Sequence, residues 1–136
     1  MAFTRRSFWG AKSPVLCQPG TVYSSGGNNF IGVTIGSANP TEANKQTAWP
    51  VKGIFRGLRA LTRDSQANGS LTITLRINGA DTPLTVTIPN AGGAATYSDL
   101  IHAAAGKEGD LVCYNAVQSS STSATVNAIA MEFVSI

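Results

Sequence analysis

The stretch LTITLRINGADTPLTVTIP, residues 71–89, decides the fold class. Apolar and polar side chains alternate from Leu71 to Asn78, and the alternation returns from Leu84 to Ile88. A period of two is typical of a strand with one buried and one exposed face. Between the two runs, residues 78–81 read Asn-Gly-Ala-Asp, which suits a turn with positive φ. The stretch therefore predicts a β-hairpin.

The hairpin places its apolar side chains on one face. If Ile77 pairs with Thr82 across a four-residue loop, three further apolar pairs form, namely Leu75 with Leu84, Ile73 with Val86 and Leu71 with Ile88. Burying seven such side chains contributes roughly 10–20 kcal/mol, whereas ordering each residue costs about 1–2 kcal/mol. An isolated hairpin is therefore unstable, and we expect a second layer to cover it.

Composition extends the all-β prediction to the whole chain. Only 12% of the 136 residues are charged, and Gly, Ser, Thr and Asn separate short apolar runs. The length of the chain suits a single domain with one hydrophobic core. No stretch has the roughly 18 apolar residues of a membrane span, and the N-terminal residues lack the apolar segment of a signal peptide. We expect a soluble protein made in the cytoplasm, a reducing compartment, with Cys17 and Cys113 free and buried rather than paired.

The N-terminal residues form a separate unit in this prediction. Residues 1–19 have no hydrophobic period and contain two prolines, so we expect an extended arm ahead of a β-sandwich domain at residues 20–136. Such an arm reaches up to about 60 Å, beyond the roughly 35–40 Å width of the domain. It carries three aromatic and three basic side chains, namely Phe3, Phe8, Trp9, Arg5, Arg6 and Lys12. The aromatic side chains either fold back on their own domain or anchor in another protein.

Three later segments allow specific expectations. Residues 49–61 form a long extended run. The spacing of Lys52, Arg56, Arg59 and, just beyond the run, Arg63 indicates either a basic ridge that binds a partner or a charged, solvated sheet edge. Residues 94–101 suit a strand, although 98–106 could instead be a short helix ending at Gly106. The closing run, 124–136, is apolar on both faces and suits a central strand.

Charge and motifs exclude several function classes. Nine of the ten Lys and Arg residues lie in residues 1–76, whose net charge is +7, against −4 for residues 77–136. Three cations in the arm are few for binding nucleic acid, which we therefore do not expect. Ser98, Asp99 and His102 are local neighbours without an evident triad arrangement, so we expect no catalytic residue and no enzyme. The Cys and His spacing suits no metal site, and we expect no cofactor.

About eight extended segments with a central hairpin suit a jelly-roll-like antiparallel β-sandwich. Three segments carry a resemblance, namely residues 71–89, the run AATYSDLIHAAAGKEGDLVCYNAV at 94–117 and ATVNAIAMEFVSI at 124–136. Their order is similar to that of the small β-sandwich proteins of tailed-bacteriophage virions, in which an NGxxTxLTVTI-like hairpin precedes a GDLV-type strand and a closing strand. The resemblance covers roughly residues 70–136.

The resemblance implies a capsid decoration, or cement, protein on the outer capsid surface of a virion. Such a protein is a homotrimer that clamps neighbouring major capsid protein subunits. We expect Phe3, Phe8 and Trp9 to enter apolar pockets of the partner and Arg5, Arg6 and Lys12 to meet its acidic groups, with Arg56, Arg59 and Arg63 as further partner-binding candidates. Removal of residues 1–12 should leave a folded domain that no longer binds capsids.

Two other readings remain open. A receptor-binding head domain of a tail fibre or spike would use loops such as residues 36–47 or 118–123 to hold a host glycan or surface protein. These loops contain no aromatic side chain for stacking on a sugar. A coat subunit of a small virus would instead use the arm to bind the genome and would assemble alone into particles that contain nucleic acid.

Overall fold

The structure, a computed structural model, describes residues 12–22, 28–34, 36–62, 69–90, 92–119 and 124–136. Within these residues the chain forms twelve strands, one 3-10 turn and no α-helix. The elements are β1 (Lys12–Cys17), β2 (Gly20–Val22), β3 (Asn28–Ile31), β4 (Ala38–Asn39), the turn η2 (Glu42–Asn44), β5 (Thr47–Ala48), β6 (Gly53–Thr62), β7 (Leu71–Ile77), β8 (Ala80–Ile88), β9 (Ala95–Gly106), β10 (Leu111–Gln118), β11 (Ala124–Val126) and β12 (Ala128–Ser135). The predicted all-β class is confirmed.

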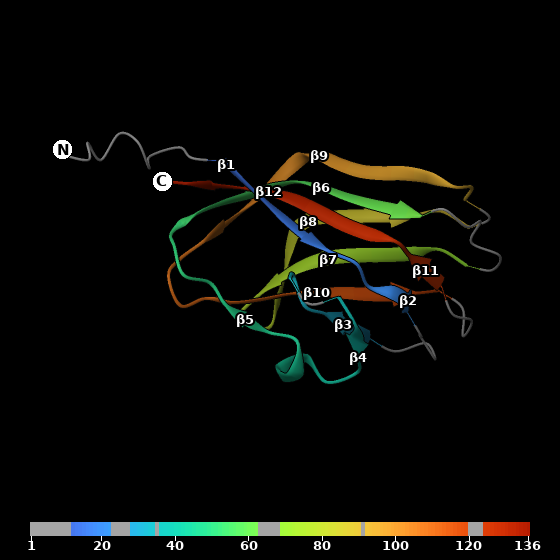
Figure 1. The fold of residues 1–136 in the computed structure, drawn as a ribbon, viewed down its shortest axis with the longest axis horizontal. Helices are drawn as coiled ribbons and strands as arrows, with labels where there is room; N and C mark the ends of the chain where they lie inside the picture. Colours follow the sequence, from blue (N-terminus) through green and yellow to red (C-terminus); the bar gives the residue numbers. More distant parts are fainter. Residues whose placement is uncertain (1–11, 23–27, 35, 63–68, 91, 120–123) are drawn as a thin grey trace.

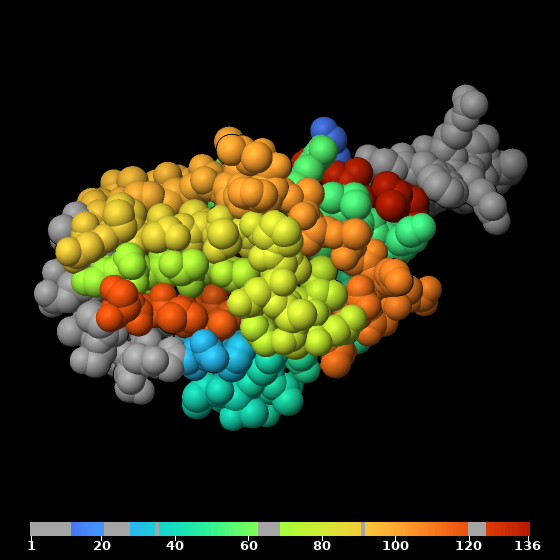
Figure 2. All heavy atoms as spheres, turned by 180° about the vertical axis from the view of Figure 1, so that it is seen from behind, coloured from blue at the N-terminus to red at the C-terminus, as the bar shows by residue number. Residues whose placement is uncertain are grey.

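The strands form an antiparallel sandwich of the jelly-roll type. The first sheet has the order β1-β12-β6-β9, and the second has the order β4-β3-β10-β7-β8, with β5 paired to β10. A short third sheet joins β2 to β11. In Figure 1 the first sheet lies in front of the second, and Figure 2 shows the second sheet from behind with β9 running along β8.

The core lies between the inward faces of the two sheets. Phe55 and Leu58 on β6 and Ile129 on β12 are fully buried from one side, and Leu75 and Tyr114 are fully buried from the other. At one end, the rings of Trp49, Phe55 and Phe133 meet with centroids 4.9–5.1 Å apart. The sandwich thus supplies the second layer that the hairpin requires.

The hairpin forms with a tighter turn than predicted. Leu71 pairs with Ile88 and Ile73 with Val86, as expected. Ile77, however, pairs with Ala80 across the two-residue turn Asn78-Gly79, and not with Thr82. The register shifts between Thr74 and Arg76, so that Leu75 alone lies opposite the three residues 82–84. The physical reason is that Pro83 has no N–H to donate, and Thr82 Oγ1 donates to the Leu75 carbonyl at 2.8 Å instead.

Part of the predicted arm belongs to the sandwich. The sequence predicts an arm over residues 1–19, but residues 12–17 form β1. This strand pairs with β12 from Lys12↔Val134 to Cys17↔Ile129. Val15 and Cys17 are buried on its inward face, and Pro14 is tolerated because β1 is an edge strand. Residues 1–11 lie outside the described part of the chain, where the arm remains a prediction.

Three further expectations are decided by strand pairing. The helix considered for residues 98–106 is absent, because these residues extend β9 and pair with β6. β12 is central, as predicted, between β1 and β6. The alternative of a solvated edge for the basic run is wrong for β6, which lies between β12 and β9. Its arginines therefore occupy a sheet face.

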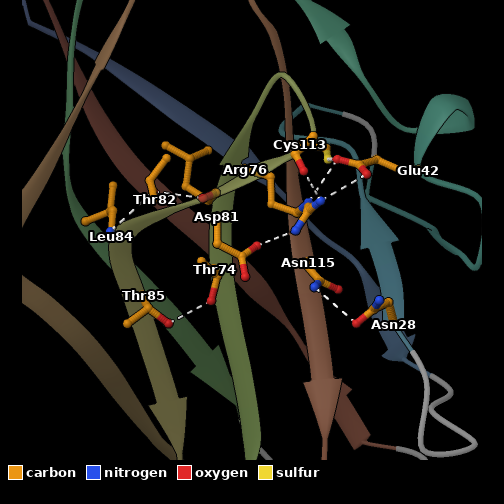
Figure 3. Close-up of polar contacts among 12 residues, drawn as sticks. Asn28, Glu42, Thr74, Arg76, Asp81, Thr82, Leu84, Thr85, Cys113 and Asn115 are labelled. Carbon is orange, nitrogen blue, oxygen red and sulfur yellow. Dashed lines mark hydrogen bonds and ion pairs between the residues drawn. The ribbon is translucent and has the colours of Figure 1, made fainter.

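A polar cluster fastens residues 36–47 to the outer face of the second sheet. Arg76 Nε donates to Glu42 Oε1 at 2.9 Å and Nη2 donates to Oε2 at 3.3 Å, so β7 holds the turn η2 (Figure 3). The Glu42 hydrogen bond raises the pKa of Arg76, with a further contribution from Asp81. Thr41 precedes η2 but makes no side-chain cap. This loop is therefore structurally anchored.

Candidate partner-binding surface

The structure brings three of the predicted binding residues together. Lys12 on β1 and Arg56 and Arg59 on β6 line one hollow of about 600 Å³ on the outer face of the first sheet. They meet because β12 lies between β1 and β6 and carries Glu132, which pairs with Pro14 on one side and Arg56 on the other. The remaining candidates, Phe3, Arg5, Arg6, Phe8, Trp9 and Arg63, lie outside the described residues.

One carboxylate serves two of these cations. Arg56 Nε donates to Glu132 Oε2 at 2.6 Å, and Lys12 Nζ lies 3.9 Å from Glu132 Oε1. The Arg56 hydrogen bond is the main reason that the pKa of Glu132 lies below its ordinary value. Exposed pairs of this kind stabilise a fold little. They do orient charged groups on the surface.

Arg59 forms no salt bridge within 4 Å among the described residues, although its positive charge contributes to lowering the pKa of Glu132. Arg59 Nη1 makes one long hydrogen bond, 3.4 Å, to the Gly57 carbonyl. The hollow thus carries three cations and one anion, and Arg59 is an exposed residue. An acidic group on a partner would complement this charge.

Apolar side chains contribute to the same hollow. Pro14, Leu100, Ala130 and Met131 line it beside the charged residues. Among these, Leu100 on β9 is a large apolar residue that is 64% exposed. Leu100 was not among the predicted binding residues. Its adjacency to Ile101 in an apolar pair was the available signal, because one of two consecutive strand residues normally faces outward.

A bulge sets the position of Leu100. Arg56 pairs with Ala103 and Leu58 pairs with Asp99, so residues 100–102 of β9 lie opposite Gly57 alone. Gly57 adopts φ +64, a conformation that favours glycine. β6 is thus irregular at Gly57, whereas Gly53 lies in regular pairing with Gly106 and Ser135.

Asp99 organises the bulge and joins the two sheets. Its carboxylate is buried and accepts hydrogen bonds at 3.1 Å from the backbone N–H groups of Ile101 and His102 and, across the gap between sheets, of Thr85 on β8. His102 Nδ1 lies 2.9 Å from Asp99 Oδ2. Burial opposes ionisation, but these hydrogen bonds outweigh it and lower the pKa of Asp99 to about 2.

Ser98, Asp99 and His102 share a second, shallower hollow with Thr85, Thr87 and Tyr97. In the described part of the chain, no hydrogen bond links Ser98 to His102, and the Asp99 carboxylate is engaged by three backbone amides. The geometry accounts for Asp99 as a structural residue. No group of three or more His, Cys, Asp or Glu side chains suited to a metal ion occurs in the described ranges.

Both cysteines are free and buried, as predicted. Burial raises the pKa of the Cys17 and Cys113 thiols to about 12 in each case. For Cys113, the negative charge of Glu42 adds to this effect, and Cys113 Sγ lies 3.6 Å from Glu42 Oε1. Neither thiol is a reactive surface group.

No helix in the described residues has the length and apolar character needed to cross a membrane.

The surroundings of the alternative receptor-binding loops differ from those of the hollow. Residues 36–47 are held by the Arg76–Glu42 pair, whose side chains are only 17% and 22% exposed. The opposite charges of Arg76 and Glu42 are therefore paired with each other within the fold. Residues 120–123 of the other loop lie outside the described residues.

Comparisons with known proteins give a limited result. No protein-family model matches the sequence, and no curated protein matches it. Among solved structures, the chain is similar to the native structure of a family 35 carbohydrate binding module from Clostridium thermocellum. The identity is 15% and the TM-score 0.46, over 88% of this chain and 97% of that chain. The jelly-roll-like sandwich is assigned from the chain's own strand pairing.

Proposed function

We propose that this chain is a structural virion protein that decorates a bacteriophage capsid and stabilises it by bridging neighbouring major capsid protein subunits. The observation that carries the proposal is the convergence of Lys12, Arg56 and Arg59 on one outer sheet face. Residues 1–11 join the fold at Lys12, which lies on this face. The aromatic and basic segment of residues 1–11 is therefore connected directly to the basic surface formed by Lys12, Arg56 and Arg59.

Bridging requires two contacts that reach different subunits. Residues 1–11, if extended, span up to about 36 Å, a distance comparable with the width of the domain. The sheet face supplies a contact that is fixed relative to the core. Acidic groups on a capsid would favour both contacts, and electrostatic attraction would chiefly accelerate binding. The proposed assembly is a homotrimer on the outer surface, which sedimentation of the purified chain would test.

Truncation tests the proposal. Because Lys12 is the first residue of β1, the deletion should remove residues 1–11 and keep Lys12. We expect the truncated chain to fold with an unchanged melting temperature and to bind undecorated capsids at least 10-fold more weakly, measured by co-sedimentation. Arg59→Glu should weaken binding further, whereas the matched change Lys107→Glu in the β9–β10 turn should not. Normal decoration by a folded chain that carries both the deletion and Arg59→Glu would overturn the proposal.

Immunogold labelling of intact virions provides an independent test. Decoration predicts label over the whole head. Label confined to the tail tip would contradict the proposal and favour a receptor-binding domain. Particles that form from this chain alone with nucleic acid inside would indicate a coat subunit.

A further inference from the structure

Two neighbouring apolar side chains protrude from the bulge in β9. Ile101 is 89% exposed and Leu100 is 64% exposed, the two highest values among the large apolar residues that the structure describes. β9 is the outer strand of the first sheet and lies along one side of the molecule (Figure 2). Both side chains are thus accessible to another molecule.

Specific interactions stabilise the bulge that presents these two side chains. Gly57 supplies the positive φ on β6, and three residues of β9 lie opposite it. The buried Asp99 carboxylate fixes the backbone amides of Ile101 and His102 and ties them to Thr85 on β8. Desolvating a carboxylate is unfavourable unless hydrogen bonds compensate. The bulge is therefore rigidly held, with Leu100 and Ile101 in fixed positions.

Protection of a sheet edge does not account for the choice of residues. Edge strands avoid pairing with other chains by means of bulges, prolines and charged side chains. A bulge that served only this purpose would carry polar residues at its tip. Leu100 and Ile101 instead add apolar surface, which favours contact with another protein.

Basic side chains lie beside Leu100, one member of this pair. Leu100 lines the hollow that contains Lys12, Arg56 and Arg59. An apolar anchor beside basic groups fits a partner surface in which an apolar pocket is bordered by carboxylates. A second copy of this same face is disfavoured as the occupant, because it would bring like charges together.

We infer that Leu100 and Ile101 are anchor residues that enter an apolar pocket bordered by Asp or Glu side chains on a partner protein, with Arg59 contacting the carboxylates. The inference deepens the proposed function and rests on it only for the identity of the partner, the major capsid protein. It assigns the fixed contact to the domain itself, separately from residues 1–11.

Site-specific photocrosslinking tests the contact. A benzophenone amino acid replaces Ile101 in one chain and, as the matched control, Val117, which is 38% exposed on β10 in the other sheet. Each chain is bound to purified undecorated capsids and irradiated, and the cross-linked peptides are identified by mass spectrometry. Position 101 should cross-link to an apolar peptide of another protein that contains Asp or Glu, and position 117 should not.

Substitution measures the size of the contribution. Ile101→Ser should weaken capsid binding roughly 10- to 100-fold, as expected for removing one buried apolar anchor. Val117→Ser should change binding less than about 3-fold, and both variants should keep the melting temperature of the parent. Because Ile101 is almost fully exposed, its substitution leaves the core intact.

The outcomes separate the inference from the proposed function. Cross-linking of position 101 to an acidic apolar segment of a virion protein other than the major capsid protein would support the anchor and contradict the proposed function. Decoration that depends on residues 1–11 but yields no cross-link at 101 and no loss with Ile101→Ser would overturn the anchor alone. A cross-link to a second copy of this chain, to lipid or to nucleic acid would also overturn it.

Discussion

Asp99 shows how one side chain serves two parts of the molecule. Ser98 and His102 lie close to Asp99 in the sequence, but their spacing predicts no catalytic triad. In the structure the Asp99 carboxylate holds the β9 bulge and reaches Thr85 in the other sheet. The same side chain therefore closes one side of the sandwich and positions the exposed pair at residues 100–101.

Asp99→Asn should lower the free energy of unfolding at pH 7 by about 1–3 kcal/mol. The folded-state pKa of about 2 lies below the ordinary value of 3.8, so the stabilising contribution is present above pH 4 and is lost as pH falls toward 2. The variant should thus lack this part of the acid sensitivity. Urea unfolding at pH 7, 4 and 2.5 measures the effect.

Glu108→Gln is the matched control for Asp99→Asn. It removes the same charge from an exposed residue in the β9–β10 turn. Its stability at pH 7 should change by less than about 0.5 kcal/mol. Equal stabilities of the two variants across this pH range would show that Asp99 does not hold the bulge.

At the scale of single elements, the β7–β8 hairpin combines a local preference with a tertiary adjustment. Asn78 and Gly79 adopt φ +53 and +78, the combination of a type I′ turn whose twist matches a hairpin. The turn is also tied to its surroundings, because Asn78 Nδ2 donates to Asp110 Oδ1 at 2.9 Å. Asn-Gly therefore closes the hairpin with two residues rather than four.

Gly79→Ala tests the turn. Alanine at this positive φ should lower the stability by about 1–2 kcal/mol through backbone strain. No steric clash adds to this cost, because no atom outside the chain neighbours lies within 4 Å of the new Cβ. Gly93→Ala is the control, since Gly93 has the same open space without a positive φ. Chemical unfolding of both variants should show a loss only for Gly79→Ala. Equal losses would contradict the assigned turn geometry.

At the scale of the whole molecule, aromatic packing joins the first sheet to the segment that enters it. The Phe55 ring contacts the rings of Trp49 and Phe133. It also lies so close to the backbone of Gly106 that a Cβ added to this glycine would be 2.7 Å from Phe55 Cε2. β6 and β9 can pair there only because Gly106 has no side chain. Stability at this end depends on three distant parts of the sequence.

Phe55→Ala should destabilise the fold by about 3–5 kcal/mol, because it leaves a cavity in a core that cannot fully collapse. Ile54→Ala on the outward side of the same strand should cost clearly less. Thermal and urea unfolding measure both values. If Phe55→Ala does not fold, Phe55→Leu should still show a loss of about 1 kcal/mol or more. Equal effects at positions 54 and 55 would contradict the inward orientation of Phe55.

The sequence predicted those features that depend on local pattern. Alternation identified the hairpin and its inward face, and the low content of charged residues indicated an all-β chain. The apolar character of both faces of the last run indicated its central position. The sequence also allowed us to select Lys12, Arg56 and Arg59 as binding candidates, although not to see that they share one hollow. That residues 12–17 form a strand was missed, because two prolines concealed a short edge strand.

Pairing between distant residues decided the rest. The hollow exists because β12 lies between β1 and β6, and the anchor pair protrudes because β9 accommodates three residues opposite Gly57. Side-chain alternation is a property of each strand alone. Strand order, register and bulges instead depend on the packing of the two sheets as a whole. The sequence alone thus determined an antiparallel sandwich, and only the tertiary structure determined where its exposed charges and apolar side chains meet.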